Sequence, residues 1–184
     1  MKKYLLGLLI LSGTAVFGQV QTDYYSNGVK KSEGAFVSTS KSANVIKASD
    51  GSSRPDPSQP KTGKWEYWYD SGAKSAEENY NSGVTSGIWK TWYSAGAQSS
   101  EINYSTGKAT FWYPNGKKQS EGSMLVNRIF DGSWTFWFDT GVKNGEGNYV
   151  SGKKNGVWKW YDASGNLTST ETYNMDVLVD SKKQ

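Results

Sequence analysis

The sequence predicts an all-β fold, an elongated antiparallel meander of tandem β-hairpins in a single twisted or curled sheet. Three observations support this prediction. A strand–turn–strand unit recurs along the chain, its aromatic residues alternate at the two-residue period of strands, and its turns end in glycine. Because the repeats contain no helical period, almost no helix is expected.

The recurring unit is clearest from Gly63 to Tyr80, where a strand, a tight turn and a second strand follow one another. Spacing is constant within each copy but varies between copies, so each copy is one hairpin joined to the next by a loop. The copies open at Gly63, Gly87, Gly107, Gly132 and Gly156. The hairpins are expected at residues 67–80, 91–104, 111–124 and 136–149. Five tandem hairpin repeats thus occupy residues 63–173, after a half repeat at residues 19–36.

Residues 1–18 have the features of a secretory signal peptide. Lys2 and Lys3 form its positive start, and an apolar run from Tyr4 to Val16 follows. The alternative, a transmembrane anchor, is disfavoured because the run is shorter than the roughly 20 apolar residues that cross a bilayer. We therefore expect the chain to be exported to the periplasm, the outer envelope or the extracellular space, with no transmembrane span after cleavage.

Composition argues against catalysis and against nucleic-acid binding. The formal net charge is +4, and the loss of Lys2 and Lys3 with the signal peptide leaves +2, which is too little to attract nucleic acid. The chain has no His and no Cys. Imidazole bases, Ser–His triads, thiolate nucleophiles, disulfides and most zinc sites are therefore excluded. We expect a non-enzymatic protein with no cofactor and no metal.

A mobile loop is expected over residues 37–62, between the half repeat and the first full repeat. The segment is rich in Ser, Lys and Pro, and its prolines exclude a central strand. Its low hydrophobicity leaves little to bury. The alternative is a partner-binding loop that presents Val45 and Ile46. At the other end of the chain, residues 174–184 are expected to form a tail, in which residues 177–179 are a candidate last short strand.

Alternation along the strands divides the aromatic residues between the two faces of the sheet. In the first repeat Trp65, Tyr67 and Tyr69 point to one face, which becomes a broad aromatic wall, whereas Trp68 points to the other. One tryptophan per repeat recurs as a candidate binding or structural ladder: Trp68, Trp92, Trp112, Trp137 and Trp160. Either each ring packs over the neighbouring hairpin and donates its N–H to a fixed acceptor, or the rings bind a ligand together.

Two further columns follow from the fixed spacing. The turn glycines are expected to have positive φ, which glycine tolerates best. They are Gly28, Gly72, Gly96, Gly116, Gly141 and Gly165. Five residues after the first five of them stands a glutamate column of Glu33, Glu77, Glu101, Glu121 and Glu146, with a partner column of Lys30, Lys74, Gln98, Lys118 and Lys143. Because a glycosidase uses one pair of carboxylates, we interpret the evenly spaced glutamates as structural, through cross-strand pairs or backbone hydrogen bonds.

The last copy, from Gly156 to Tyr173, departs from the spacing of the other copies. Tyr161 comes one residue early and the following turn is one residue longer, so a one-residue slip is expected there unless a bulge absorbs it. Terminal repeats are often atypical because they cap the stack. We therefore interpret this copy as a C-terminal cap.

The pattern Gly-x-Trp-x-x-Trp-Tyr-x-x-Gly-x-x-x-x-Glu-x-x-Tyr, present at residues 63–80 and 87–104, resembles the MORN-repeat variant, which occurs in bacterial proteins labelled YwqK-type antitoxins. The resemblance covers residues 24–36 and 63–173. It implies a repeat-built antiparallel sheet that mediates protein or lipid contacts, with no catalytic residues. One copy departs from the pattern, since Ala109 replaces the first Trp and Met124 replaces the last Tyr.

Three functions from different classes remain open. The leading one is a non-enzymatic scaffold outside the cytoplasm that binds another protein or itself, antitoxin-like by resemblance, because Trp and Tyr dominate the energetics of broad interfaces. The second is a module whose tryptophan ladder binds cell-envelope glycans, choline-type ligands or phospholipids, and the repeats loosely resemble choline-binding cell-wall repeats. The third is a hydrolase that uses the glutamate column.

Overall fold

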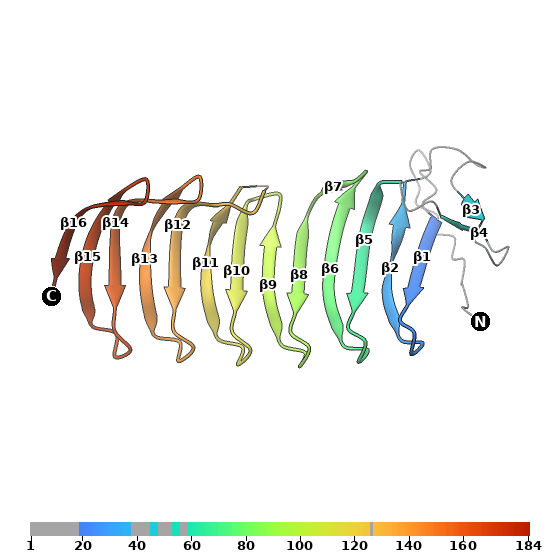
Figure 1. Ribbon diagram of the computed structural model, residues 1–184, viewed down its shortest axis with the longest axis horizontal. Coiled ribbons are helices and arrows are strands. Elements are labelled where there is room, and N and C mark those ends of the chain that lie inside the picture. The colour runs from blue at the N-terminus through green and yellow to red at the C-terminus, as the bar shows by residue number, and fades with distance from the viewer. Residues whose placement is uncertain (1–18, 38–44, 48–52, 56–58, 126) are drawn as a thin grey trace. The chain divides into compact units, whose positions relative to one another are not determined.

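The computed structural model describes residues 19–37, 45–47, 53–55, 59–125 and 127–184. The expected signal peptide and most of the expected loop at residues 37–62 lie outside the described residues. Over the described part of the chain there are strands and turns but no helix. Fourteen strands form one antiparallel meander sheet that does not close, and β3 and β4 pair separately (Figure 1). The predicted all-β meander of hairpins is confirmed.

The chain divides into two compact units, and the first spans Met1–Gly96. Its strands are β1 (Gln19–Tyr24), β2 (Lys30–Phe36), β3 (Val45–Lys47), β4 (Ser53–Pro55), β5 (Lys61–Trp68), β6 (Lys74–Asn81), β7 (Val84–Thr85) and β8 (Ile88–Trp92). Within this unit the sheet order is β1-β2-β5-β6-β8, and the short β7 pairs with β6. Each strand is antiparallel to its neighbour.

The second unit spans Ala97–Gln184. Its strands are β9 (Gln98–Asn103), β10 (Lys108–Trp112), β11 (Lys118–Met124), β12 (Phe130–Trp137), β13 (Lys143–Val150), β14 (Lys153–Tyr161), β15 (Leu167–Asn174) and β16 (Val177–Lys183). They pair in sequence order. Figure 1 shows the glycine-containing turns of this unit along one edge of its strands and the connections between hairpins along the opposite edge.

Each hairpin turn ends in a glycine with positive φ. The values are 83° at Gly28, 86° at Gly72, 93° at Gly96, 80° at Gly116, 89° at Gly141 and 86° at Gly165. Beside the turn, a one-residue bulge shifts the register, so that Tyr67 pairs with Ala76 but Trp68 pairs with Lys74, and Ser75 is the extra residue. β5 ends at Trp68, so Tyr69 belongs to the turn and does not extend the aromatic wall as expected.

The expected slip in the last copy is wrong. The interval from Gly156 to Gly165 equals that from Gly63 to Gly72, and the register is the same. Trp160 pairs with Ser169 before the bulge, as Tyr67 does with Ala76, and Tyr161 pairs with Leu167 beyond it, as Trp68 does with Lys74. The last copy has the same number of residues between its two glycines as the first copy, but different residue types. Trp160 therefore occupies the position of Tyr67 and not that of Trp68.

Two segments outside the repeats differ from expectation. Val45–Lys47 and Ser53–Pro55 form a small antiparallel pair inside the segment expected to be a loop, with the proline at the strand end, where its missing N–H costs least. The tail is also more regular than expected. β16 runs from Val177 to Lys183 because a tight turn at Met175 and Asp176, both with positive φ, returns the chain against β15.

One repeat position on the first face is buried in both units. It is occupied by Trp65 and Trp89 in the first unit and by Ala109, Trp134 and Trp158 in the second, all at most 9% exposed. Each tryptophan in it donates its indole N–H to a backbone carbonyl of an earlier part of the chain: Trp65 to Ala35 (2.9 Å), Trp89 to Asn79 (2.9 Å), Trp134 to Ser123 (2.8 Å) and Trp158 to Asn148 (3.2 Å). These bonds satisfy the one polar group of each buried ring.

Glycines on the preceding strand make room for these rings. A Cβ at Gly122 would overlap the ring of Trp134, and the same holds for Gly34 with Trp65 and Gly147 with Trp158. The large and small residues exchange strands in one place, where Ile102 on the earlier strand pairs with Ala109 on the later strand. In these four pairs the sizes on neighbouring strands are complementary, which explains why Ala109 departs from the tryptophan column.

Candidate functional site

The second face carries a ladder of lysines over aromatic rings. The lysine Nζ atoms lie 4.8 Å from the Trp68 ring centroid (Lys30), 5.3 Å from Trp92 (Lys74), 5.2 Å from Trp137 (Lys118) and 5.6 Å from Tyr161 (Lys143). In each case the lysine belongs to one hairpin and the ring to the next. Trp112 stands at the same position of its hairpin and is half-buried. Cation–π contacts of this kind hold neighbouring hairpins together.

The same lysines pair with the glutamate column. The Nζ–carboxylate distances are 2.8 Å for Lys30–Glu33, 3.0 Å for Lys74–Glu77, 2.6 Å for Lys118–Glu121 and 2.8 Å for Lys143–Glu146. The partners are three residues apart on one strand, whereas Lys74–Glu66, at 2.6 Å, is a cross-strand pair. The hydrogen bond from Lys143 lowers the pKa of Glu146. A glycosidase acid needs a raised pKa, so this environment does not suit that role. Glu101 lies half-buried on β9.

Tyrosines in the turns add a second connection between hairpins. The hydroxyl of Tyr25 donates to the carbonyl of Trp68 (2.8 Å), that of Tyr69 to Trp92 (2.7 Å) and that of Tyr113 to Trp137 (2.9 Å). Trp68, Trp92 and Trp137 are thus each contacted by a lysine ammonium at the ring and by a tyrosine hydroxyl at the backbone carbonyl. These contacts connect consecutive hairpins, which indicates a structural role for the ladder.

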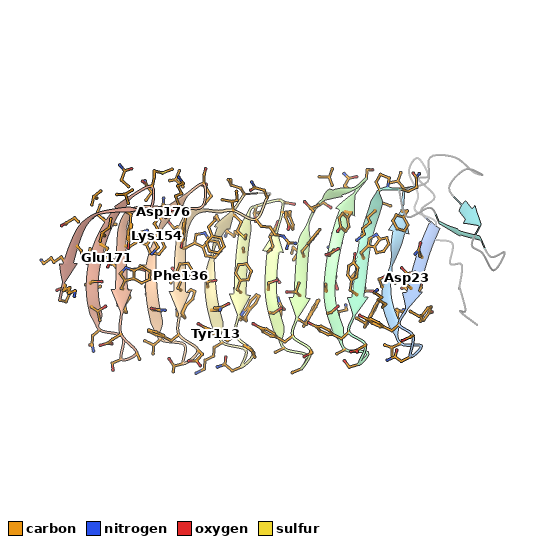
Figure 2. All side chains as sticks on the ribbon, in the orientation of Figure 1. Asp23, Tyr113, Phe136, Lys154, Glu171 and Asp176 are labelled. Carbon is orange, nitrogen blue, oxygen red and sulfur yellow. The ribbon has the colours of Figure 1, made fainter. Side chains whose placement is uncertain are left out.

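Two lysines on the first face lie inside aromatic cages. Nζ of Lys61 lies 4.7 Å from the ring of Trp65, 5.1 Å from Tyr67 and 5.1 Å from Tyr80. Nζ of Lys154, which is labelled in Figure 2, lies 4.9 Å from Trp158, 4.6 Å from Trp160 and 4.9 Å from Tyr173. Both lysines stand two residues before the opening glycine of their repeat. Trp160, expected in the ladder, is therefore part of a cage.

A glutamate accompanies each cage. The hydroxyl of Tyr80 donates to Glu78 and that of Tyr173 to Glu171, both at 2.7 Å, and the Trp160 N–H also donates to Glu171 at 2.6 Å. Burial, followed by the hydrogen bond with Glu78, raises the pKa of Tyr67 far above its usual range, and the bond with Glu171 raises the pKa of Tyr173. These phenols stay neutral, and each cage is filled by the chain's own ammonium group.

A row of exposed apolar side chains runs along the connections between hairpins in the second unit. We call Leu125, Val150 and Met175 the apolar loop row; their exposed fractions are 41%, 38% and 40%. They recur every 25 residues, at the edge opposite the glycine turns (Figure 1). Exposed Arg128 and Lys153 lie in the same connections.

The connection that carries Met175 has a strained backbone. Met175 and Asp176 have φ of 51° and 74°, a conformation that is rare for residues other than glycine and asparagine. The Asp176 N–H donates to the carbonyl of Lys154 at 2.9 Å, and the Lys154 N–H donates to the Asp176 carboxylate at 2.7 Å (Figure 2). Ser82 and Ser151 have φ of 48° in the corresponding two-residue connections, so this conformation belongs to the hairpin turn.

Sequence reasoning missed the cages and the row. A comparison of the position two residues before each opening glycine, occupied by Lys61, Thr85, Ser105, Phe130 and Lys154, would have pointed to the cages. The described residues hold no cluster of three or more acidic side chains suited to a metal ion. Within the same residues, no helix is long and apolar enough to span a membrane.

Three stretches of the chain match a known repeat family. Residues 61–82, 105–125 and 154–175 match the family model described as MORN repeat variant. The three stretches cover less than half of the chain, and they begin at or next to the position that holds Lys61 and Lys154 in the cages. Repeats of this kind are generally non-enzymatic modules, often involved in protein or membrane-lipid interactions. No curated protein matches the chain.

Proposed function

We propose that the chain is a non-enzymatic repeat scaffold that binds a protein partner outside the cytoplasm through the apolar loop row. The observation that carries this proposal is the exposure of Leu125, Val150 and Met175 at one edge of the second unit. In repeat proteins, the loops on one side of the stack are often the binding surface. Export rests on the sequence of residues 1–18, and the mass of the mature chain in cell fractions would test it.

The charges beside the row define the partner's surface. Arg128 and Lys153 are exposed, whereas the nearby carboxylates of Asp131 and Asp176 accept backbone N–H groups of Ser151 and Lys154 at 2.9 and 2.7 Å. Both signs of charge therefore flank the apolar side chains of the row. An apolar protein surface with charges of both signs at its rim is complementary to it. An antitoxin role would be one form of such binding.

The tryptophan ladder supports this choice over a ligand-binding ladder. Lysine ammonium groups lie over the rings of Trp68, Trp92 and Trp137. A glycan or choline-type ligand would have to displace them to reach these ring faces. The hydrolase interpretation is weaker still, because the glutamates are paired with the same lysines.

Site-specific photo-crosslinking tests the proposal. A photoreactive residue at position 150, in the row, is expected to give a discrete protein adduct in the native host. The matched control is position 157, because Val157 is more exposed (55%) but lies on β14 away from the connections. With the purified partner, Val150→Asp should weaken binding by at least ~10-fold, whereas Val157→Asp should not.

Three outcomes would overturn the proposal. One is equal adducts from positions 150 and 157. Another is partner binding that does not change in Val150→Asp. The third is that Val150→Asp abolishes binding to vesicles of anionic phosphatidylglycerol while no protein adduct forms, which would assign the row to a lipid surface.

A further inference from the structure

A pocket of about 350 Å³ lies in the second unit beside the turns of β10–β11 and β12–β13. Its volume is at the small end of ordinary ligand sites, about 300–1,000 Å³. Its lining includes Phe111, Phe136, Gln119, Asn144 and Tyr113. None of its lining side chains carries a formal charge, and it involves neither the apolar loop row nor the caged lysines.

Two phenylalanines supply flat apolar surface to the pocket. Phe111 and Phe136 each stack against Trp134, with centroids 6.2 and 5.9 Å away and interplanar angles of 26° and 25°. Trp134 is 1% exposed, so both half-buried rings rest on a fixed core residue. Phe136 also stacks on Trp158 at 6.1 Å. The pocket therefore has preformed aromatic surfaces.

Two carboxamides occupy equivalent positions beside these rings. Gln119 and Asn144 are the extra residues of the bulges in β11 and β13, and both line the pocket. The corresponding bulge residues of other hairpins are Lys31, Ser75 and Thr168. A carboxamide offers two N–H donors and one carbonyl acceptor, so this pair can hydrogen-bond neighbouring hydroxyl groups on a ligand.

The neutral character of the pocket comes from a substitution within the repeat. At the position where Lys61 and Lys154 place an ammonium over the first face, this hairpin has Phe130, which stacks on Trp134 at 3.8 Å and also lines the pocket. The hydroxyl of Tyr113 donates to the backbone carbonyl of Trp137 at 2.9 Å. Neither residue brings charge to the site.

We propose that this pocket binds a neutral pyranose ring, alone or at the end of a glycan. The apolar face of such a ring packs on aromatic surface, and its hydroxyls match the donors and acceptors of Gln119 and Asn144. The lack of a carboxylate in the lining disfavours a choline-type cation. This site goes beyond the proposed protein scaffold and stands independently of it.

Side-chain amide NMR on the full chain tests the proposal. The probes are cellobiose, maltose and N,N′-diacetylchitobiose, with choline chloride and N-acetylphenylalanine amide as comparison compounds. At least one saccharide is expected to shift the side-chain amide resonances of Gln119 and Asn144, with a Kd of roughly 1 mM. Gln119→Ala and Asn144→Ala should each weaken that binding by about 10-fold. Ser75→Ala, at the same bulge position in the first unit, should not.

Thermal melts of all variants establish that they remain folded, so weaker binding would not reflect loss of structure. The proposal is overturned if none of the three saccharides shifts these resonances, or if saccharide affinity is unchanged in both Gln119→Ala and Asn144→Ala. Preferential binding of N-acetylphenylalanine amide would also overturn it, because the pocket would then receive an aromatic side chain of a protein.

Discussion

Trp134 and Trp137 lie three residues apart in β12, yet their surroundings differ. Trp134 is in the buried column and donates its N–H to the carbonyl of Ser123. Trp137 is half-buried under the ammonium of Lys118. Alternation along the strand predicts that they face opposite sides, but burial depends on the neighbouring hairpins, about 25 residues away in the sequence.

Substitution separates the two roles. Trp134→Ala should lower the free energy of unfolding by about 3–5 kcal/mol, because it removes a fully buried ring. Trp137→Ala should cost less, about 1–2 kcal/mol, because it removes a half-buried ring and one cation–π contact. Chemical denaturation of the two variants measures the difference. Equal losses would mean that the second-face ring is as much a core residue as the first-face ring.

The pair of Ile102 and Ala109 tests size complementarity between strands. Ala109→Trp should be destabilising because its ring would overlap Ile102, and Ile102→Gly should be destabilising because it removes a buried side chain. The double variant recreates the arrangement of Gly122 and Trp134. Its loss of stability should be smaller than the sum of the two single losses by at least ~1 kcal/mol. Strict additivity in urea denaturation would contradict complementarity.

The Lys143–Glu146 pair predicts how stability depends on pH. The hydrogen bond from Lys143 holds the pKa of Glu146 below its ordinary value of 4.5. The pair therefore stabilises the fold above pH 4.5, and that contribution is lost as the pH falls through the lower pKa of the folded state. Both side chains are partly exposed, so Glu146→Gln should cost less than about 1 kcal/mol at pH 7. Melting curves should show this difference at pH 7 and its disappearance near pH 3; a difference that persists in acid would argue against the ion pair.

At the scale of the elements, the turns are the feature that sequence predicts best. A glycine at a fixed place after an aromatic strand indicates positive φ by a local rule. The bulge beside each turn was not predicted, because its extra residue can be Lys31, Ser75, Gln119 or Asn144 and has no common type. In the last repeat, residue type misleads in the same way. Its Trp-Tyr pair stands one position early and suggests a missing residue, whereas the glycine interval shows that none is missing.

Gly116 provides the test of the turn geometry. Its φ is 80°, and a Cβ there would meet no atom within 4 Å. The cost of Gly116→Val should therefore arise from backbone strain alone, about 1–2 kcal/mol for a residue forced into the left-handed region. Ala97→Val, just after the turn glycine of another hairpin and not at positive φ, is the control. Equal melting temperatures for the two variants would show that the turn does not require glycine.

At the scale of the whole molecule, the sequence predicts the repeat architecture but not the candidate sites. Period-two aromatics are enough to indicate a hairpin meander. The pocket depends on Phe130 in one repeat replacing the lysine found in two others, and the apolar loop row depends on which connections leave their side chains in solvent. Because the pocket and the apolar loop row both depend on contacts between adjacent hairpins, neither can be predicted from the sequence of a single repeat.

The residues of the second unit should fold without the first. Its buried cluster of Ile102, Ala109, Met124 and Trp134 lies entirely within Ala97–Gln184, as do the aromatic residues packed against it. In repeat proteins each unit contacts only its neighbours, so stability is approximately a sum of local terms. A fragment of residues 97–184 should show near-UV circular dichroism from its packed aromatic rings and a cooperative thermal transition. Trp134→Ala in the same fragment should abolish both. A fragment without near-UV signal, or one that melts without a transition, would show that the cluster cannot fold alone.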